Sequence, residues 1–134
     1  MILRLPNVIG LNKKTLVYNL YNKIKNNDCI LVDNYLKKEF LHINEIPVLL
    51  NLLIELETET INIGFNRSIP IKLIVKILAE HLQKTPNIKE FIFKYNYKCD
   101  YNYFLKFIEN KYFYKFKLKE LLLNKDFLIG MESQ

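Results

Sequence analysis

Glycine, cysteine and histidine are scarce in this chain of 134 residues, and each scarcity excludes a kind of site. Three glycines cannot supply a glycine-rich phosphate-binding loop. The cysteines, Cys29 and Cys99, are too few for a disulfide framework and show no C-x-x-C spacing, so a reducing, cytoplasmic compartment is favoured. The histidines, His42 and His81, lack the spacing of metal ligands. We therefore expect no metal, no cofactor and no catalytic residue, and predict that the chain is not an enzyme.

A long hydrophobic run is also missing. The longest nearly apolar stretch, Pro47 to Leu56, is interrupted by Asn51 and Glu55 and falls short of the roughly 18 residues that a membrane span requires. No signal-peptide core precedes Pro6. Half of the residues are nevertheless hydrophobic, and 25% are charged, which is enough apolar material for one soluble domain over residues 1–134.

The charge balance is basic, with 20 lysines and arginines against 14 acidic residues and a net charge of +6. Such a balance raises nucleic acid as a partner. The lysines are dispersed among acids for most of the length, however, and an A/T-rich coding sequence would supply the same abundance of Lys, Asn, Ile, Tyr and Phe. Basicity alone therefore indicates no particular partner.

A short pattern occurs three times along the chain. Two apolar residues stand two positions apart, and an asparagine follows three residues later: Cys29, Leu31 and Asn34, then Ile61, Ile63 and Asn66, then Phe91, Phe93 and Asn96. The asparagines are separated by 32 and then 30 residues (from 34 to 66 and from 66 to 96), and an apolar helical pattern fills each interval. A fixed period of this size is typical of stacked strand-helix repeats.

Helical and strand patterns alternate accordingly. We expect helices at about 13–25 with Asn12 as cap, from Asn44 to Glu57, from a Ser68 cap to Pro86, and at about 101–110 with Asp100 as cap. We expect strands at Cys29–Val32, Thr60–Gly64, Glu90–Lys94 and near 113–118, a connection at 34–43, and a cap at 121–129. Because each crossover returns the chain to the same end, the strands should form one parallel sheet in an α/β fold. If the apolar residues of the repeated pattern face the core, Cys29 is a buried, inert thiol.

The pattern resembles the leucine-rich repeat, in particular the helix-containing class typified by ribonuclease inhibitor. The run from Ile61 to Asn66 carries the resemblance best, whereas the spacing is long for that family and the last unit lacks its asparagine. The resemblance implies a short, degenerate solenoid with an N-terminal helix and a C-terminal cap. It also implies that Asn34, Asn66 and Asn96 form a hydrogen-bonded ladder inside the turns. The alternative is three unrelated strand-helix pairs in a compact α/β domain.

In a solenoid, alternate strand residues face outwards along one surface. That surface would be mixed in charge at one end and basic at the other, with apolar anchors between, as protein-binding faces are. The predicted partner-binding residues are Ile30, Val32, Asn62, Glu90, Ile92, Lys94, Lys115 and Lys117. The alternative is a sheet covered by helices on both sides, which would leave no such face.

The segment 112–119 interleaves aromatic residues with lysines, a combination that single-stranded nucleic acids favour. A half-buried edge strand shows the same alternation, because edge lysines also prevent aggregation. We therefore predict a non-enzymatic protein-interaction module, of the kind that a bacterial or viral effector delivered into a host cell would use. A basic nucleic-acid-binding domain is the alternative, and no membrane partner is expected.

Overall fold

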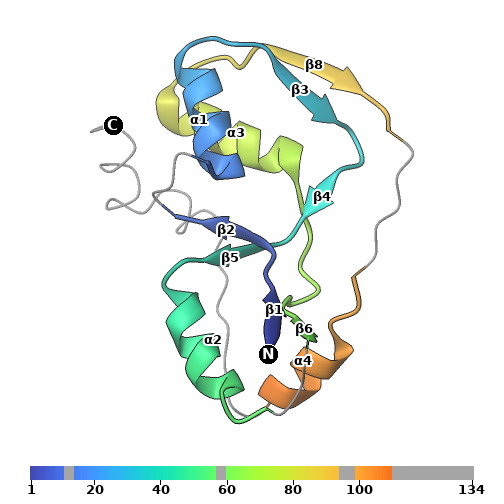
Figure 1. Ribbon diagram of the computed structural model, residues 1–134. Helices are drawn as coiled ribbons and strands as arrows, with labels where there is room; N and C mark the ends of the chain where they lie inside the picture. Colours follow the sequence, from blue (N-terminus) through green and yellow to red (C-terminus); the bar gives the residue numbers. More distant parts are fainter. Residues whose placement is uncertain (11–13, 57–59, 94–98, 110–134) are drawn as a thin grey trace.

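The computed structural model describes residues 1–10, 14–56, 60–93 and 99–109 (Figure 1). Short strands and four helices alternate in this part of the chain. In order they are β1 (Ile2–Arg4), β2 (Asn7–Ile9), α1 (Leu16–Lys25), β3 (Ile30–Asp33), β4 (Lys37–Lys38), β5 (Phe40–His42), α2 (Glu45–Leu53), β6 (Thr60–Asn62), β7 (Ile69–Pro70), α3 (Ile71–Leu82), β8 (Ile88–Phe91) and α4 (Asn102–Ile108).

The strands pair two by two. Three pairs are parallel, β1 with β6, β2 with β5 and β3 with β8, and the β4–β7 pair is antiparallel. No pair joins a third strand within the described residues. The predicted single parallel sheet is therefore wrong, because the strands expected to be neighbours, β3 and β6, pair with different partners.

One hydrophobic cluster lies between the β3–β8 pair and the helices α1 and α3, which pack against each other beside it (Figure 1). The side chain of Thr15 caps α1 by accepting a hydrogen bond from the Tyr18 N–H at 3.3 Å. Both helices carry an apolar stripe at helical spacing, and these stripes meet. Residues of the stripes that are buried include Val17, Leu20, Tyr21 and Ile24 of α1 and Ile74, Val75 and Leu78 of α3.

A second cluster fills the other end of the molecule, where α2 and α4 pack with β5 and β6 (Figure 1). Its buried members are Leu41, Leu49, Leu53, Ile61, Ile63, Phe104 and Ile108. The ring of Phe65 meets the ring of Phe104 edge to face at 5.5 Å, a geometry that aromatic pairs favour. The two clusters flank the β2–β5 pair, which contributes Ile9 and Phe40 to the first and Leu41 to the second.

The expected helices are all present, with ends shifted by a few residues. Ser68 does not cap α3, whose N-cap position is Pro70, and the helix ends at Gln83 in a left-handed conformation before Pro86. The carboxylate of Asp100 accepts a hydrogen bond from the Asn102 N–H at 2.9 Å at the start of α4. The sequence patterns missed β1, β2, β4, β5 and β7, each of three residues or fewer. The predicted Asn12 cap, strand 113–118 and cap 121–129 lie outside the described residues.

The solenoid and its asparagine ladder are also wrong. Asn34 and Asn66 are both exposed, and their strands, β3 and β6, do not pair. Asn66 lies in a turn with φ 54°, a left-handed conformation that asparagine tolerates better than most residues. Asn96 lies outside the described residues. What recurs in the fold is a helix followed by a strand, α1–β3 and α3–β8, packed side by side.

Candidate functional site

Polar residues lie at the ends of several parallel strands, the edge at which α/β proteins place their ligands. Arg4 and Asn62 are opposite one another at the ends of β1 and β6. His42 ends β5 beside Ile9, and Asp33 ends β3. These ends belong to separate strand pairs, so the polar residues are distributed along the molecule and do not converge on one centre.

Glu39 links several segments of this region through hydrogen bonds. Its carboxylate accepts hydrogen bonds from the backbone N–H groups of Phe65 and Arg67, both at 3.0 Å. Its own carbonyl accepts from the backbone and the side chain of Asn7 at 3.1 and 3.3 Å. Glu39 therefore holds the loop after β6 against the β2–β5 pair. Partial burial raises the pKa of the Glu39 carboxyl, and hydrogen bonds from the Phe65, Arg67 and Asn66 backbone oppose that rise.

The start of this loop is Gly64, which is buried beneath Tyr101. A β-carbon at Gly64 would lie 2.4 Å from Cε1 of Tyr101 and 2.5 Å from Oε2 of Glu39, so any larger residue requires these side chains to move. Next to it, the Asn62 side-chain amide donates to the carbonyl of Asp100 at 3.2 Å. The Asn62 Oδ1 is buried and has no hydrogen-bond partner in the described part of the chain.

Exposed cationic residues lie in this loop and on the neighbouring strand β4. Lys37 and Lys38 form β4, Arg67 follows Asn66 in the loop, and all three are exposed. Because Lys38 is opposite Ile69 in the antiparallel β4–β7 pair, these three cations lie on adjacent segments. They form the basic group of the site, which we call the β4 cation group.

His42 is the buried polar residue of the described core, with 9% of its surface exposed. Its Nδ1 accepts a hydrogen bond from the Asn44 N–H at 3.2 Å, which places the proton of the neutral ring on Nε2. Burial lowers the pKa of His42 below its ordinary value of 6.5. No local pattern assigns His42 a role, because its burial depends on the pairing of β5 with β2.

We predict that the His42 contribution to stability is lost on acidification. A lowered folded-state pKa means that the unfolded chain binds the proton more readily, so stability falls as the pH drops below the ordinary histidine pKa of 6.5 that the unfolded chain has. His42→Asn keeps an acceptor for the Asn44 N–H but does not titrate. Urea unfolding at pH 7.5 and 5.5 should show a larger loss for the wild type than for His42→Asn. An equal loss in both proteins would contradict this assignment.

The predicted outer face is only partly exposed. Ile30 and Val32 are 1% and 0% exposed, so the prediction that they are surface anchors is wrong. The phase of β3 is the reverse of the expected one: Leu31 is 66% exposed, and Cys29, expected to be buried, is exposed too. Three consecutive apolar residues at 30–32 do not reveal which face is buried, and packing against α1 and α3 decides it.

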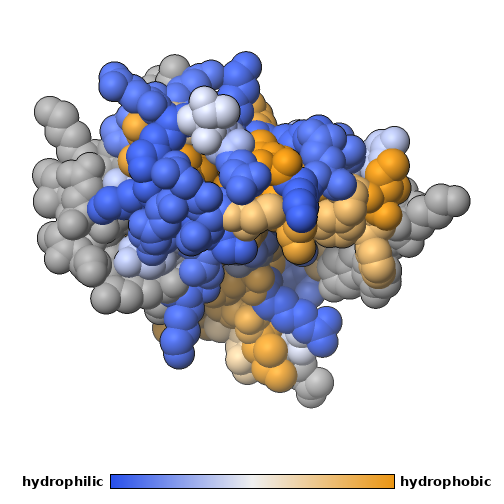
Figure 2. Space-filling model, turned by 90° about the horizontal axis from the view of Figure 1, so that it is seen from above, coloured by the Kyte–Doolittle hydropathy of each residue, from blue (hydrophilic) through white to orange (hydrophobic). Residues whose placement is uncertain are grey.

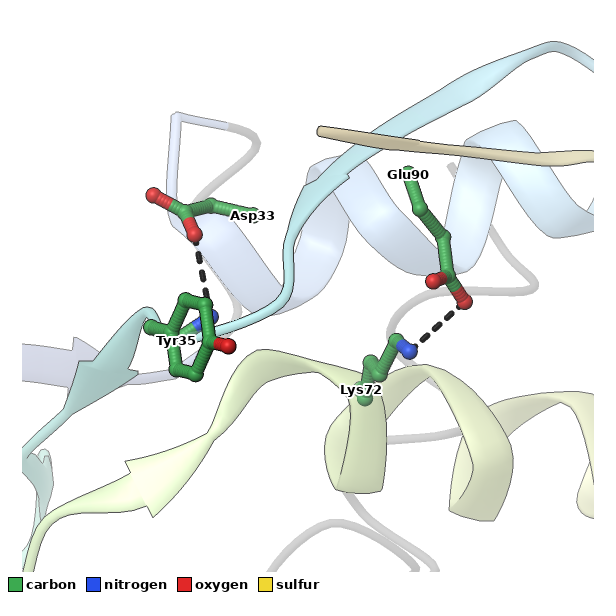
Figure 3. A network of polar contacts seen from close by, with 4 residues as sticks. All are labelled: Asp33, Tyr35, Lys72 and Glu90. Carbon is green, nitrogen blue, oxygen red and sulfur yellow. Dashed lines mark hydrogen bonds and ion pairs between the residues drawn. The ribbon is translucent and has the colours of Figure 1, made fainter. Parts of the chain in front are cut away.

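Glu90 and Ile92 are exposed as predicted, and Asn62 is half-buried. Glu90 forms an ion pair with Lys72 at 2.6 Å, from β8 to the first turn of α3 (Figure 3). Hydrogen bonds from Lys72 and Asn34 lower the pKa of Glu90. Asp33 accepts a hydrogen bond from the Tyr35 N–H at 2.9 Å in the same region. These contacts organise the surface but form no catalytic arrangement.

The three predicted partner-binding lysines, Lys94, Lys115 and Lys117, lie outside the described residues, so the nucleic-acid alternative stays a prediction. Over the ranges that the structure describes, no three His, Cys, Asp or Glu side chains are grouped to hold a metal ion. In the same ranges, no helix is long and apolar enough to cross a membrane.

Comparison with known proteins finds similarity in structure alone. No protein-family model matches the chain, and no curated protein sequence does. The fold is similar to that of MoeE5 in complex with UDP-glucuronic acid and NAD, with a TM-score of 0.72 and 15% identity over 98% of this chain. It is similar to the Bordetella bronchiseptica enzyme WbmG in complex with NAD and UDP (TM-score 0.73, 14% identity, 98% of this chain). It is also similar to TunA, an NAD-dependent NDP-hexosamine 5,6-dehydratase of tunicamycin biosynthesis (TM-score 0.74, 16% identity, 99% of this chain).

The chain covers 47% of MoeE5, 44% of WbmG and 46% of TunA, and thus spans about half the length of these proteins. These similarities contradict the leucine-rich-repeat resemblance and the prediction of a non-enzymatic effector module, because these neighbours are NAD-dependent enzymes or carry NAD with a sugar nucleotide or UDP. The chain therefore shares its fold with about half of an NAD-dependent sugar-nucleotide enzyme.

Proposed function

We propose that this chain supplies the sugar-nucleotide side of an NAD-dependent sugar-nucleotide epimerase or dehydratase. The observation that supports the proposal is the similarity over 98% of the chain to two structures that hold NAD together with UDP-glucuronic acid or UDP. Since less than half of each of those chains is covered, only part of their ligand contacts would fall on this one.

The residues present do not fit NAD. Dinucleotide-binding α/β folds hold the pyrophosphate on a glycine-rich turn between a strand and a helix. The comparable junction here, between β2 and α1, has one glycine, Gly10. A β-carbon at Gly10 would meet the side chain of Ile43 at 3.3 Å, so this glycine is packed against a side chain. We therefore assign NAD binding to the portion of such an enzyme that this chain does not cover.

The β4 cation group suits the remaining ligand. A nucleoside diphosphate presents two phosphates, which lysine and arginine bind through charge-assisted hydrogen bonds. Lys37, Lys38 and Arg67 are exposed and lie on adjacent segments, and Glu39 holds the Arg67 loop in place through its backbone bonds. The neutral sugar and base would contact neighbouring polar groups, such as the Asn62 amide at the end of β6.

We predict that the purified chain binds UDP-glucose and UDP but not NAD. Amide shifts in two-dimensional NMR during titration with each ligand would measure this, and the shifts should centre on β4 and the 64–67 loop. Lys38→Glu should weaken UDP binding at least about tenfold, because one charge-assisted hydrogen bond is worth roughly 1.5–3 kcal/mol.

The matched control is Lys76→Glu on α3, where an exposed lysine 4.0 Å from Glu80 lies outside the proposed site. It should leave UDP binding unchanged. The proposal fails if NAD produces the larger shifts, if no UDP-dependent shift occurs, or if Lys76→Glu weakens UDP binding as much as Lys38→Glu.

We further propose a reducing, cytoplasmic compartment, which suits the free thiols Cys29 and Cys99.

A further inference from the structure

The carboxylate of Glu39 joins the two segments that carry the β4 cation group. Glu39 directly follows Lys38, the last residue of β4. Its carboxylate accepts hydrogen bonds at 3.0 Å from the backbone N–H groups of Phe65 and Arg67. The Asn66 backbone hydrogen-bonds to the same carboxylate. Lys38 is thus connected to Glu39 through the chain, and Arg67 through a hydrogen bond.

The backbone of residues 65–67 has the form that binds anions. Successive N–H groups that turn towards one point make a concave site for a negative group, and a left-handed residue is typical of such a turn. Asn66 has φ 54°, and the negative group bound here is the Glu39 carboxylate. The main chain of Glu39 is itself held, because its carbonyl accepts hydrogen bonds from Asn7 of β2. Glu39 therefore fixes the loop to β2.

Hydrophilic surface alone does not single out this loop. Hydrophilic residues also cover much of the described surface in Figure 2, which views the molecule from above. Exposed cations on unconnected segments bind a phosphate weakly, since each long side chain loses conformational freedom on binding. A loop whose backbone is already fixed loses less of that freedom. The 65–67 loop meets this condition because of its bonds to Glu39.

We propose that Glu39 is a positioning residue for the diphosphate of the sugar nucleotide, an inference that rests on the proposed function. Its carboxylate does not touch the ligand. It fixes Arg67 beside Lys38, so that the two cations meet the two phosphates together. Charge alone would act in the other direction, because a carboxylate close to an anion site repels the ligand. Position and charge therefore predict opposite results when this carboxylate is neutralised.

Glu39→Gln tests the sign of the effect. The variant keeps the shape of the side chain but loses the charge and one of the two acceptor oxygens that the loop uses. The Kd for UDP-glucose, measured by calorimetry, should rise at least about fivefold, because a charge-assisted hydrogen bond that holds the loop is lost. An unchanged or lower Kd overturns the proposal.

The matched control is Glu45→Gln. Glu45 is a half-buried carboxyl in the first turn of α2, outside the β4 cation group and the 64–67 loop. Its neutralisation removes the same charge from the protein without touching the loop, so the Kd for UDP-glucose should stay the same. A rise as large as that of Glu39→Gln would mean that net charge sets the affinity, and it would overturn the positioning role.

A double-mutant cycle shows whether Glu39 acts through Arg67. Arg67→Ala removes the guanidinium but keeps the backbone N–H that the Glu39 carboxylate binds. In the Arg67→Ala background, Glu39→Gln should change the Kd by less than about twofold, since the group that Glu39 positions is gone. An effect of Glu39→Gln that is as large without the guanidinium as with it contradicts the proposal.

Asn66 offers a second pair of variants that leave Glu39 intact. A β-branched residue adopts a left-handed conformation poorly, whereas glycine adopts it readily. Asn66→Val should therefore disturb the loop and raise the Kd for UDP-glucose as Glu39→Gln does, and Asn66→Gly should not. Equal affinities of the two Asn66 variants would show that the shape of this turn does not matter for binding, against the proposal.

Hydrogen exchange separates this inference from the proposed function. The Phe65 and Arg67 amide hydrogens should exchange faster in Glu39→Gln than in the wild type, because they lose their acceptor. Unchanged exchange would show that Glu39 does not fix the loop, and it would overturn the positioning role even if UDP-glucose binds. A wild type that binds no UDP-glucose overturns the proposed function instead, whatever the exchange rates are.

Discussion

Val32→Asp should prevent this protein from folding. Val32 is 0% exposed, inside the cluster between the β3–β8 pair and the helices α1 and α3. The buried neighbours in that cluster are apolar, so a carboxylate there would have no partner. An unpaired buried charge costs several kcal/mol, about half or more of the 5–15 kcal/mol by which a domain of this size is stable. Circular dichroism during heating should show no cooperative transition, or a Tm lowered by more than about 15 °C.

The matched control is Leu31→Asp, one residue earlier in the same strand. Leu31 is 66% exposed, so its carboxylate would remain in water, and the Tm should change by only a few degrees, as for most surface substitutions. The comparison measures the phase of β3 directly. If Leu31→Asp unfolds the protein and Val32→Asp does not, the strand presents its other face to the core.

Much of the secondary structure was predictable, because the residue spacing that reveals a helix or a strand is local in the sequence. A helix shows its buried stripe within one or two turns, so α1 and α3 are visible as apolar residues at helical spacing. Strands at 30–33, 60–62 and 88–91 were also expected to within three residues. The short strands β2 and β5 were not, because three residues give no periodicity. They are stabilised by pairing with each other across more than 30 positions.

The pairing of strands was not predictable for a different reason. The three asparagine-ended patterns imply that consecutive units stack, yet β6 pairs with β1 and β3 pairs with β8. Which strands meet depends on how the whole chain buries its apolar faces, and two different cores are involved. The pattern did identify a repeated helix-strand unit. It did not predict that the unit centred on β6 packs into the second hydrophobic cluster, apart from the other two units.

The candidate site depends on contacts between distant segments, which no local pattern records. Glu39 is one of many charged residues in the sequence, and its role appears only when the 65–67 loop, 26 to 28 positions later, brings N–H groups to its carboxylate. One signal was available. Gly64 and Asn66 follow a strand two residues apart, and both residue types mark tight turns. That turn places Arg67 beside β4.

Gly64→Ala is expected to destabilise the protein by about 3 kcal/mol, near the upper range for overpacking. Gly64 has no left-handed backbone, so its requirement is purely steric. The new β-carbon would lie 2.4 Å from Cε1 and 2.5 Å from Cζ of Tyr101, and 2.5 Å from the Glu39 carboxylate. Tyr101 would have to move, and Glu39 would lose its hydrogen bonds to the 65–67 loop. Urea unfolding should therefore show a clear fall in midpoint, and UDP binding should weaken with it.

A double-mutant cycle identifies the clash. Tyr101→Ala removes the ring that the new methyl group meets, so adding Gly64→Ala to Tyr101→Ala should cost at least about 1 kcal/mol less than adding it to the wild type. Gly10→Ala is the matched control. Its β-carbon would approach the Ile43 side chain to 3.3 Å, a contact that a shift of a few tenths of an ångström relieves. It should cost less than Gly64→Ala. If the two alanine variants are equally stable, or if the cycle shows no coupling, Tyr101 does not cover Gly64, and the loop that carries Arg67 is held in some other way.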